Sequence, residues 1–397
     1  MKKKIIYIAI QILDERNYYR YGLDYFLKNN WEVEYWDVKN AIFPRLNKNF
    51  ISNNPLMNLN SVTCITFNNF FQVLKKTVEK KNNFIFIDAI EDTFKALLLK
   101  KLLYFKGGKK IVRANFNIRF TIFQPNLFKI LLKSGFFRFF LYTIKLVLLT
   151  IKIKLVEPLL DTKPSVHFTF GSKEYANSIK KYGHGIQCKA HTATYDIYLK
   201  DLKNDIVSDD LKNKIVFIDQ DFPLPYDRRL KTNKPLFSEK KYWNSVNSFL
   251  DLVEKKYNKE VIIARHPRGN LNKNISKKRT LQHQTSQLIK NSFIVICHNS
   301  MAIQFAILWK KPLILVTTND LDHNITENYN LHHHHAKELK KKVINVDNFT
   351  KNEIENEIKV YNNIYEKYIV NYISDSHSPN LPFWSMAVEE INKRFFN

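Results

Sequence analysis

Glycine is scarce in this chain. Only 8 of the 397 residues are glycine, whereas the phosphate-binding loops of dinucleotide-binding and P-loop proteins need several glycines at fixed spacing. The scarcity argues against both motifs and leaves little room for flexible linkers. Hydrophobic residues make up 45% of the chain and aromatic residues 14%, which is enough for packed cores, and the length predicts two domains of about 150–200 residues each.

Cysteine is almost as sparse as glycine. Cys64, Cys188 and Cys297 lie far apart and show no C-x-x-C spacing, so we expect reduced thiols and no structural zinc site. An uninterrupted apolar run of about 18 residues, as a membrane-spanning helix needs, is also missing. Because the first residues do not follow the signal-peptide pattern either, we expect a cytoplasmic protein.

Acidic residues are few relative to basic ones. There are 37 Asp and Glu residues against 63 Lys and Arg residues, a formal net charge of +26. Such a charge would suit a nucleic-acid-binding protein, but the lysines are spread along the whole chain and no nucleic-acid-binding motif is present. We therefore expect no nucleic-acid partner, and contact with acidic ligands or an anionic membrane surface instead.

Short apolar runs alternate with segments of helical spacing. In the first half they predict helices at 16–29, 68–81 and 91–106 and strands at 4–10, 31–38, 61–67, 83–90 and 109–116. A second series follows the polar stretch 200–213, with strands at 214–219, 260–265, 292–297, 312–317 and 342–346. Such alternation predicts parallel sheets covered by helices on both faces. The predicted fold is α/β, with two Rossmann-like doubly wound domains facing a cleft (1–203 and 204–380) and a C-terminal helix (381–397) that returns to the first domain.

One segment, 117–160, interrupts this alternation. It carries dense blocks of Leu, Phe and Ile, and its charged residues are all basic until Glu157. Such a composition fits a helical insertion that lies in the plane of an anionic membrane with its Lys and Arg side chains at the head groups. A buried pair of helices is the alternative. On the first interpretation, the protein associates peripherally with the inner face of the cytoplasmic membrane.

A His-Pro pair ends one strand of the second domain. The β-favouring run 261–265 leads into His266, and Pro267 prevents the strand from continuing. The imidazole therefore lies at the carboxyl edge of the sheet, where open parallel sheets bind ligands. Flanked by Arg265 and Arg268, it could donate a hydrogen bond to a phosphate or give a proton to a departing one.

A second group of polar residues follows the strand that ends near 297. Asn299 or Ser300 is predicted to cap a helix, and the free N–H groups at a helix start favour an anion. The edge that carries His266 should carry this cap too. We therefore expect a donor or phosphate site that includes His298, Asn299, Ser300, Met301 and Ala302.

One triplet formally matches a metal-binding motif, and a run of four histidines also draws attention. Asp219-Gln220-Asp221 has the D-x-D form, but Phe222-Pro223 ends the strand at once, so the two carboxylates need not share a face. We expect Asp219 and Gln220 to make polar contacts with substrate or at the hinge. The run His332–His335 lacks the i, i+4 geometry of a helical metal pair, and we expect it in a solvated turn or helix start. No metal site is predicted.

The order of these motifs resembles that of the bacterial CMP-sialic-acid transferases. It is similar also to their relatives that use CMP-activated Kdo, pseudaminic or legionaminic acid in capsule and lipooligosaccharide synthesis. That family has an acidic motif at the start of the second domain, then a His-Pro motif, then a serine before a helix. The resemblance covers about 214–318 and extends more loosely to 191–196, which resembles a hinge-side loop containing Asp196. The chain departs from the pattern at 219–221, which lacks a glycine, and at Asn299, where many relatives have a second serine.

The resemblance implies a GT-B glycosyltransferase that transfers an acidic sugar from a CMP donor to a glycan or glycolipid acceptor, with inversion and without metal or cofactor. His266 would hold the CMP phosphate or act as general acid, and Ser300 would bind the same phosphate. The general base should come from the first domain, where we expect Asp14, with Asp88 and Asp196 as rivals. A UDP- or GDP-sugar transferase of the same architecture, or a non-catalytic membrane-associated scaffold of polysaccharide assembly, are the alternative functions.

Overall fold

The computed structural model describes most of the chain. The described residues are 3–11, 13–44, 61–80, 84–90, 92–113, 157–160, 162–203, 208–225, 228–229, 232, 234–269, 276–298, 300–324 and 326–396. The basic insertion predicted at 117–160 lies outside them except for its last four residues, and Asn299 lies outside them as well. None of the helices in the described ranges is long and apolar enough to cross a bilayer.

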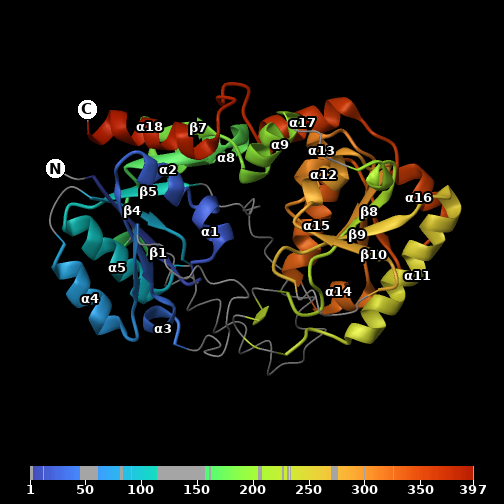
Figure 1. The fold of residues 1–397 in the computed structure, drawn as a ribbon, viewed down its shortest axis with the longest axis horizontal. Coiled ribbons are helices and arrows are strands. Elements are labelled where there is room, and N and C mark those ends of the chain that lie inside the picture. Colours follow the sequence, from blue (N-terminus) through green and yellow to red (C-terminus); the bar gives the residue numbers. More distant parts are fainter. Residues whose placement is uncertain are drawn as a thin grey trace.

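Two parallel sheets form the centres of two domains (Figure 1). The first sheet has the order β3-β2-β1-β4-β5-β6-β7, with β1 (Lys4–Ala9), β2 (Glu32–Asp37), β3 (Val62–Thr66), β4 (Phe84–Asp88), β5 (Lys109–Arg113), β6 (Val166–Phe170) and β7 (Gln187–Ala190). The second has the order β10-β9-β8-β11-β12-β13, with β8 (Ile215–Ile218), β9 (Val261–Arg265), β10 (Arg279–Gln282), β11 (Ile294–Cys297), β12 (Leu313–Thr317) and β13 (Val343–Asn345). In each sheet the chain starts in the middle, builds outward to one side and then returns to build the other. The two doubly wound domains predicted from the sequence are thus confirmed.

Helices cover both faces of the first sheet because its strands are apolar on both sides. Along β1, Ile5 and Tyr7 belong to one core while Ile6 and Ile8 belong to the other. Burial on both faces produces the near-continuous hydrophobic runs seen in the sequence. The helices that follow the strands of this domain are α1 (Glu15–Arg20), α2 (Leu23–Lys28), α3 (Lys39–Ile42), α4 (Phe70–Val78), α5 (Phe94–Phe105), α7 (Glu157–Leu160) and α8 (Gly171–Tyr182).

The second sheet is layered in the same way. Along β8, Ile215 and Phe217 pack into the core that contains α11 (Glu239–Tyr257), while Val216 and Ile218 pack into the core that contains α13 (Ile303–Leu308). The remaining helices of this part of the chain are α12 (Thr285–Lys290), α14 (Asn319–Asn324), α15 (Thr326–Glu338), α16 (Lys351–Glu357) and α17 (Asn362–Tyr372).

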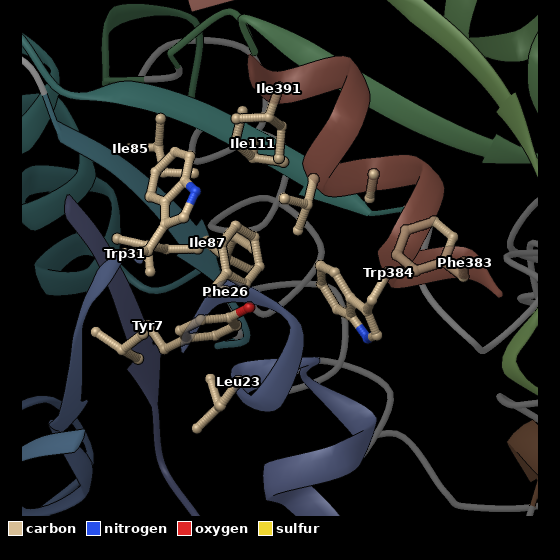
Figure 2. Close-up of a cluster of buried hydrophobic side chains, with 14 of the residues drawn as sticks. Tyr7, Leu23, Phe26, Trp31, Ile85, Ile87, Ile111, Phe383, Trp384 and Ile391 are labelled. Carbon is tan, nitrogen blue, oxygen red and sulfur yellow. The ribbon is translucent and has the colours of Figure 1, made fainter. Parts of the chain in front are cut away.

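The C-terminal helix, α18 (Phe383–Phe395), returns to the first domain as predicted. Phe383 and Trp384 are buried in the same core as Phe26 and the β1 side chain of Tyr7 (Figure 2). The ring of Trp384 lies 5.8 Å from that of Phe26, and its Nε1 donates to the carbonyl of Arg20 at 2.8 Å. The last helix is therefore part of the core of the first domain.

Packing against α18 also explains why the helix predicted at 16–29 is broken in two. Gly22 separates α1 from α2 and has a φ of +66°, a backbone conformation that favours glycine. A Cβ atom at this position would lie 2.2 Å from Cγ of Trp384. The break follows from a contact with a residue some 360 positions away, so the local helical spacing could not reveal it.

The chain crosses between the domains at two adjacent places. His191 forms an isolated antiparallel bridge with Ser374, and Thr192 Oγ1 donates to Gln304 Oε1 of α13 at 2.9 Å. Helix α9 (Ala193–Lys203) then packs against α12 and α13. This helix was assigned from the sequence to the first domain, up to residue 203. In the structure the crossing comes about ten residues earlier, because α9 buries one side against helices of the second domain.

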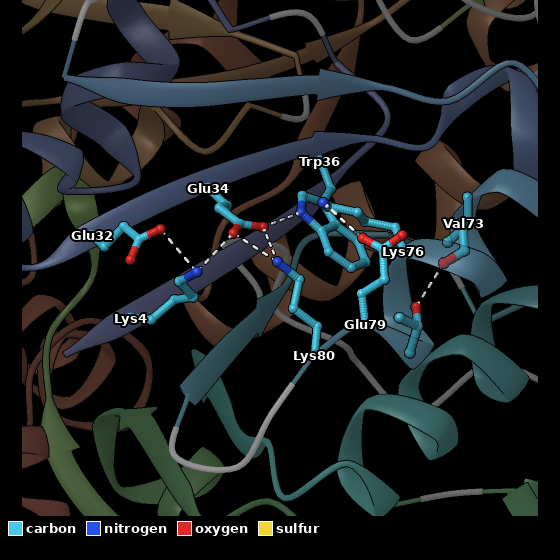
Figure 3. Close-up of polar contacts among 9 residues, drawn as sticks. Lys4, Glu32, Glu34, Trp36, Val73, Lys76, Glu79 and Lys80 are labelled. Atoms are coloured by element: carbon cyan, nitrogen blue, oxygen red, sulfur yellow. Dashed lines mark hydrogen bonds and ion pairs between the residues drawn. The ribbon is translucent and has the colours of Figure 1, made fainter. Parts of the chain in front are cut away.

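A buried ion pair lies beside the first sheet (Figure 3). Glu34 of β2 accepts from Lys80 Nζ at 2.6 and 2.7 Å and from Trp36 Nε1 at 2.8 Å. Burial opposes the charged form of Glu34, but the hydrogen bonds from Lys80 and Trp36 outweigh it and lower the pKa of this carboxyl. Lys4 completes the cluster at 3.1 Å.

The four-histidine run is not where the sequence analysis expected it. His332–His335 lies in the C-terminal half of α15, and His332 and His335 are buried rather than solvated. His335 Nδ1 is hydrogen-bonded to Tyr368 Oη at 2.8 Å. The expectation of a solvated turn was wrong because α15 packs this side against the core of the second domain.

Candidate active site

Three loops with polar residues follow neighbouring strands of the second sheet. In the register of this sheet, Ile218 of β8 lies between Ala264 of β9 and Cys297 of β11. The loops that begin at Asp219, His266 and His298 therefore leave the same edge of the sheet side by side. Strands β9 and β11 lie two strand spacings apart, about 10 Å. This edge is the point where the strand order reverses, the usual ligand-binding place in an open parallel sheet.

His266 has one ring nitrogen engaged by its own loop. Its Nδ1 accepts from the backbone N–H of Arg268 at 3.2 Å, so the neutral ring carries its hydrogen on Nε2. Its carbonyl accepts from Gln282 Nε2 at 2.7 Å and from the N–H of Gly269 at 2.8 Å, which holds the loop in place. The imidazole, which is partly exposed, thus keeps an N–H donor for a ligand.

Three arginines surround this imidazole. Desolvation lowers the pKa of His266 to about 4, and the positive charges of Arg16, Arg268 and Arg229 add to the shift. Because each guanidinium favours the uncharged ring, His266 is neutral at pH 7 in this structure. We call Arg16, Arg229, Arg268 and His266 the arginine–histidine cluster. An anion bound among these residues would be stabilised by three cations and would raise the pKa of the histidine.

Further contacts of Arg229 and Arg268 hold the cluster together. Arg229 Nη1 pairs with the carboxylate of Asp221, and its Nη2 donates to the carbonyl of Arg268 at 2.6 Å. Arg268 Nη2 in turn donates to Gln11 Oε1 at 3.0 Å and to Asn17 Oδ1 at 2.9 Å. Gln11 and Asn17 follow β1, the central strand of the first sheet. The carboxyl edges of the two sheets therefore meet at Arg268.

Asp14 stands on the first-domain side of this meeting point. It caps α1 by accepting from the N–H of Asn17 at 2.7 Å through Oδ1. Its other oxygen, Oδ2, lies 3.7 Å from Arg268 Nη2. Asp14, the base predicted from the sequence, and Arg268, two residues after His266, thus lie close together although they belong to different domains. Asp14 also has a structural role as a helix cap.

The rivals of Asp14 are both engaged elsewhere. Asp88 pairs with the buried ammonium of Lys100. Asp196, in the first turn of α9, accepts from the N–H of Phe383 at 2.7 Å and so caps the start of α18. Asp196 also lies 3.7 Å from His191 at the domain crossing, where the sequence analysis expects a hinge.

The D-x-D triplet forms a turn. Asp219 Oδ1 accepts from the N–H of Asp221 at 2.7 Å, and Asp221, which has a φ of +62°, pairs with Arg229. Burial raises the pKa of Asp219 to about 6. The two carboxylates thus have separate partners, and Gln220 lies half-buried between them. In the described part of the chain no group of three or more His, Cys, Asp or Glu side chains is placed to hold a metal ion.

Two of the predicted donor-site residues are enclosed within the second domain. His298 Nδ1 is bonded to the carbonyl of Val316 at 2.7 Å and Nε2 to Tyr242 Oη at 2.8 Å. Both nitrogens are thus used by protein groups and the ring is buried, so the expectation of a ligand-binding His298 is corrected to a structural role. Arg265 is buried too, with its Nε 4.0 Å from Asp219 Oδ2. The guanidinium of Arg265 thus places a positive charge beside the turn that begins at Asp219. Pro267, which is half-buried, ends the strand.

Ser300 caps a turn, not a full helix start. Its Oγ accepts from the N–H of Ala302 at 3.2 Å, and the N–H of Ile303 donates to its carbonyl at 3.1 Å. Helix α13 begins only at Ile303, after a tight turn through Met301 and Ala302. Ser300 lies at the same sheet edge as His266, across the loop of Asp219.

Sequence reasoning missed four residues of this site: Gln11, Arg16, Asn17 and Arg229. Arg16 follows Asp14 by two positions, and Arg229 belongs to a pair of arginines shortly after the D-x-D turn. A basic residue seven to eleven positions after a strand end was the available signal. Gln11 and Asn17 had none, since amides after a strand are common in loops and helix starts.

Comparison with known proteins gives a likeness in structure alone. Neither a protein-family model nor a curated protein sequence matches the chain. Among solved structures, the wall teichoic acid polymerase TagF soaked with CDPG for 15 minutes superposes with a TM-score of 0.51, at 11% identity over 99% of this chain and 90% of that chain. The chain has the GT-B fold.

Other similar structures fall slightly lower. The UDP-GlcNAc 2-epimerase from Methanocaldococcus jannaschii has a TM-score of 0.48 at 12% identity, over 99% of this chain and 100% of that chain. The glycotransferase of kitacinnamycin has a TM-score of 0.49 at 9% identity, over 99% of both chains. At such identities the likeness concerns the fold and not the substrate.

Proposed function

We propose that the protein is an inverting, metal-independent glycosyltransferase that moves an acidic sugar from a CMP donor to a glycan or glycolipid acceptor. The observation that carries this proposal is the arginine–histidine cluster between the two GT-B domains. Three guanidinium groups and an N–H donor at the reversal point of the sheet suit a phosphate group. Because these groups are cations already, the negative charge of a departing phosphate needs no metal ion for its stabilisation.

In the proposed reaction the acceptor hydroxyl oxygen attacks the anomeric carbon of the donor sugar. The bond between that carbon and the phosphate oxygen breaks, and its electron pair stays on the phosphate, which leaves as CMP. Asp14 takes the proton of the attacking hydroxyl. The guanidinium groups of Arg16, Arg229 and Arg268 stabilise the charge that grows on the phosphate.

His266 would donate a hydrogen bond from Nε2 to the phosphate. The low pKa of the histidine in the unliganded site means that it begins as a neutral donor. The singly charged phosphodiester of a bound donor would offset part of the charge of the three arginines and raise that pKa, and the dianion that forms as CMP leaves would raise it further. Ser300, at the same sheet edge, is proposed to bind the same phosphate from the other side of the Asp219 turn.

The acceptor and the membrane complete the proposal. A glycolipid acceptor would be reached from the inner face of the cytoplasmic membrane, where the basic segment at 117–160 is proposed to lie. This part of the proposal depends on the composition of that segment.

The nucleotide is tested by thermal protection. A ligand at about 100 times its dissociation constant adds about 2.7 kcal/mol to the free energy of unfolding. We expect CMP to raise the melting temperature more than UDP or GDP does, and Arg229→Gln to remove most of this rise. The matched control is Arg279→Gln, an exposed arginine of β10 that pairs with Asp210. Stronger protection by UDP or GDP would favour the alternative of a transferase for those donors, and no protection by any nucleotide would favour the non-catalytic scaffold.

Kinetics then tests the two motif residues. His266→Ala should lower turnover about 10²–10⁴-fold, because the hydrogen bond strengthens as charge develops. Ser300→Ala should mainly raise the donor KM. A donor screen across CMP-activated sugars, with mass detection of released CMP, identifies the sugar. A folded His266→Ala variant that keeps wild-type turnover would exclude this histidine from the reaction.

A further inference from the structure

Helices α4 and α5 form the outer layer of the first domain. They pack against each other and lie on the side of the first sheet that faces away from the second domain (Figure 1). Their inner sides are buried through Val73 and Thr77 of α4 and Leu99 and Leu103 of α5. Their outer sides should therefore be polar in an ordinary surface helix.

The outer side of α5 is not polar. Phe94, Leu98, Lys101 and Phe105 follow one another at intervals of four, three and four residues, so they share one side of the helix. Phe94 is 60% exposed and Phe105 is 71% exposed. The ammonium of Lys101 lies over the ring of Phe105 at 5.5 Å from its centre.

Helix α4 repeats the pattern. Phe71, Lys75 and Val78 lie four and three residues apart on its outer side, and all three are exposed. Phe71 is 76% exposed. Leu159 of α7, which packs against α5, is exposed as well. Large exposed apolar side chains that gather on adjoining elements mark an interaction surface.

The charge of this surface is positive. Lys75 and Lys95 are exposed, and Lys101 and Lys106 are half-buried between the apolar groups. Glu79 pairs with Lys76 at 3.0 Å, while Asp92 shares the ammonium of Lys100 with Asp88. Six lysines (75, 76, 95, 100, 101 and 106) thus stand against these three carboxylates among the described residues, and the surface is positive on balance.

We propose that the outer face of α4, α5 and α7 docks on an anionic lipid bilayer. Phenylalanine side chains enter the interfacial region, while lysines extend to the phosphate groups of the lipids. A second copy of the chain fits this face poorly, because a two-fold contact of identical surfaces would bring the lysines of both copies together. The docking surface is independent of the identity of the donor.

Co-sedimentation of the full-length chain with lipid vesicles tests the proposal. The probes are vesicles of phosphatidylcholine alone and vesicles with equal parts of phosphatidylglycerol and phosphatidylcholine. We expect binding to the anionic vesicles, weakened by salt. The double substitution Phe94→Ser and Phe105→Ser should reduce the partition coefficient by about tenfold or more. Lys75→Gln with Lys101→Gln should reduce it by about fivefold for each lysine.

The control is a matched double substitution on another helix, Ile197→Ser and Leu202→Ser of α9, whose side chains are 45% and 52% exposed. It should leave vesicle binding unchanged. Unchanged binding of the phenylalanine variant, with an unchanged circular dichroism spectrum, would overturn the proposal. So would equal binding to neutral vesicles, or a dimer that this variant abolishes. Thermal protection of the phenylalanine variant by CMP tests the donor site separately. A failure of the membrane-docking proposal can therefore be distinguished from a failure of the proposed transferase function.

Discussion

Replacing Asp14 by asparagine separates the two tasks that the structure assigns to this residue. Oδ1 caps α1 through the N–H of Asn17, and Oδ2 faces Arg268 at 3.7 Å. An asparagine oxygen caps a helix about as well as a carboxylate does, but a neutral amide cannot accept the proton of an acceptor hydroxyl. Asp14→Asn should therefore keep the fold and lose the reaction.

The magnitudes follow from the same contacts. Losing the charge near the helix start costs about 0.3–1 kcal/mol. Asp14→Ala also removes the cap and should cost about 1 kcal/mol more, which lowers the melting temperature by about 2–4 °C further in a domain of this size. Both variants should lower turnover by about 10²–10⁴-fold if Asp14 is the general base.

Thermal melts followed by circular dichroism measure the first effect, and the release of CMP from the donor measures the second. Glu15→Gln is the matched control, since Glu15 is the next acidic residue, is exposed and belongs to the same first turn. It should keep its activity. An Asp14→Asn variant that retains more than about a tenth of wild-type turnover would refute the assignment and direct the search to Asp88 or Asp196.

Three further predictions concern stability. Gly22→Ala should cost about 2–5 kcal/mol, because its Cβ would meet Trp384 in addition to the strain of a positive φ. Gly183→Ala meets no atom within 4 Å and should cost only the strain of its backbone conformation, φ +77° and ψ −179°, about 1–3 kcal/mol. A larger loss for Gly183→Ala than for Gly22→Ala in denaturant unfolding would contradict this packing. Glu34→Ala should lower the free energy of unfolding by about 3–5 kcal/mol, because it leaves the ammonium of Lys80 buried without its partner. Exposed ion pairs contribute less than about 1 kcal/mol, so a loss below that value would mean that water reaches Lys80. The free energy of unfolding should fall as the pH drops from about 6.5 toward 4, since desolvation lowers the pKa of buried histidines below the unfolded value and the unfolded chain binds more protons in that range. The buried histidines are His167, His298 and His335, and at pH 5 each should contribute about 2 kcal/mol of this loss. A denaturant midpoint that stays constant between pH 7 and 5 would refute their burial.

Much of the fold could be predicted from local patterns. Continuous apolar runs such as 261–265 and 294–297 form strands because both faces of a parallel sheet are buried. The prolines at 223 and 267 follow strands closely, and polar loops appear at their carboxyl ends. The edge strand β10 escaped prediction, because Arg279–Gln282 is polar and partly exposed and so lacks an apolar pattern.

The candidate site was only partly predictable. Asp14, His266 and Ser300 stand where strand ends predicted polar residues. The environment of each could not be predicted: burial and three arginines keep His266 neutral, and two protein contacts occupy both nitrogens of His298. A local pattern reports only on residues three or four positions away, so it cannot predict which side chains of other strands and loops lie beside a given residue.

Local patterns in the chain predicted the two doubly wound sheets, the helix that returns at the C-terminus, and which residues end the strands of the second domain. These features depend on the alternation of burial and on the backbone limits of proline, which act over a few residues. Which charged groups lie close together follows from the way the two domains pack. Arg268 reaches Gln11 and Asn17, more than 250 positions away, and Gly22 is placed by the ring of Trp384. Such contacts depend on how whole domains and helices pack, and electrostatic and steric energies are set by distances in space, which no local pattern in the chain encodes.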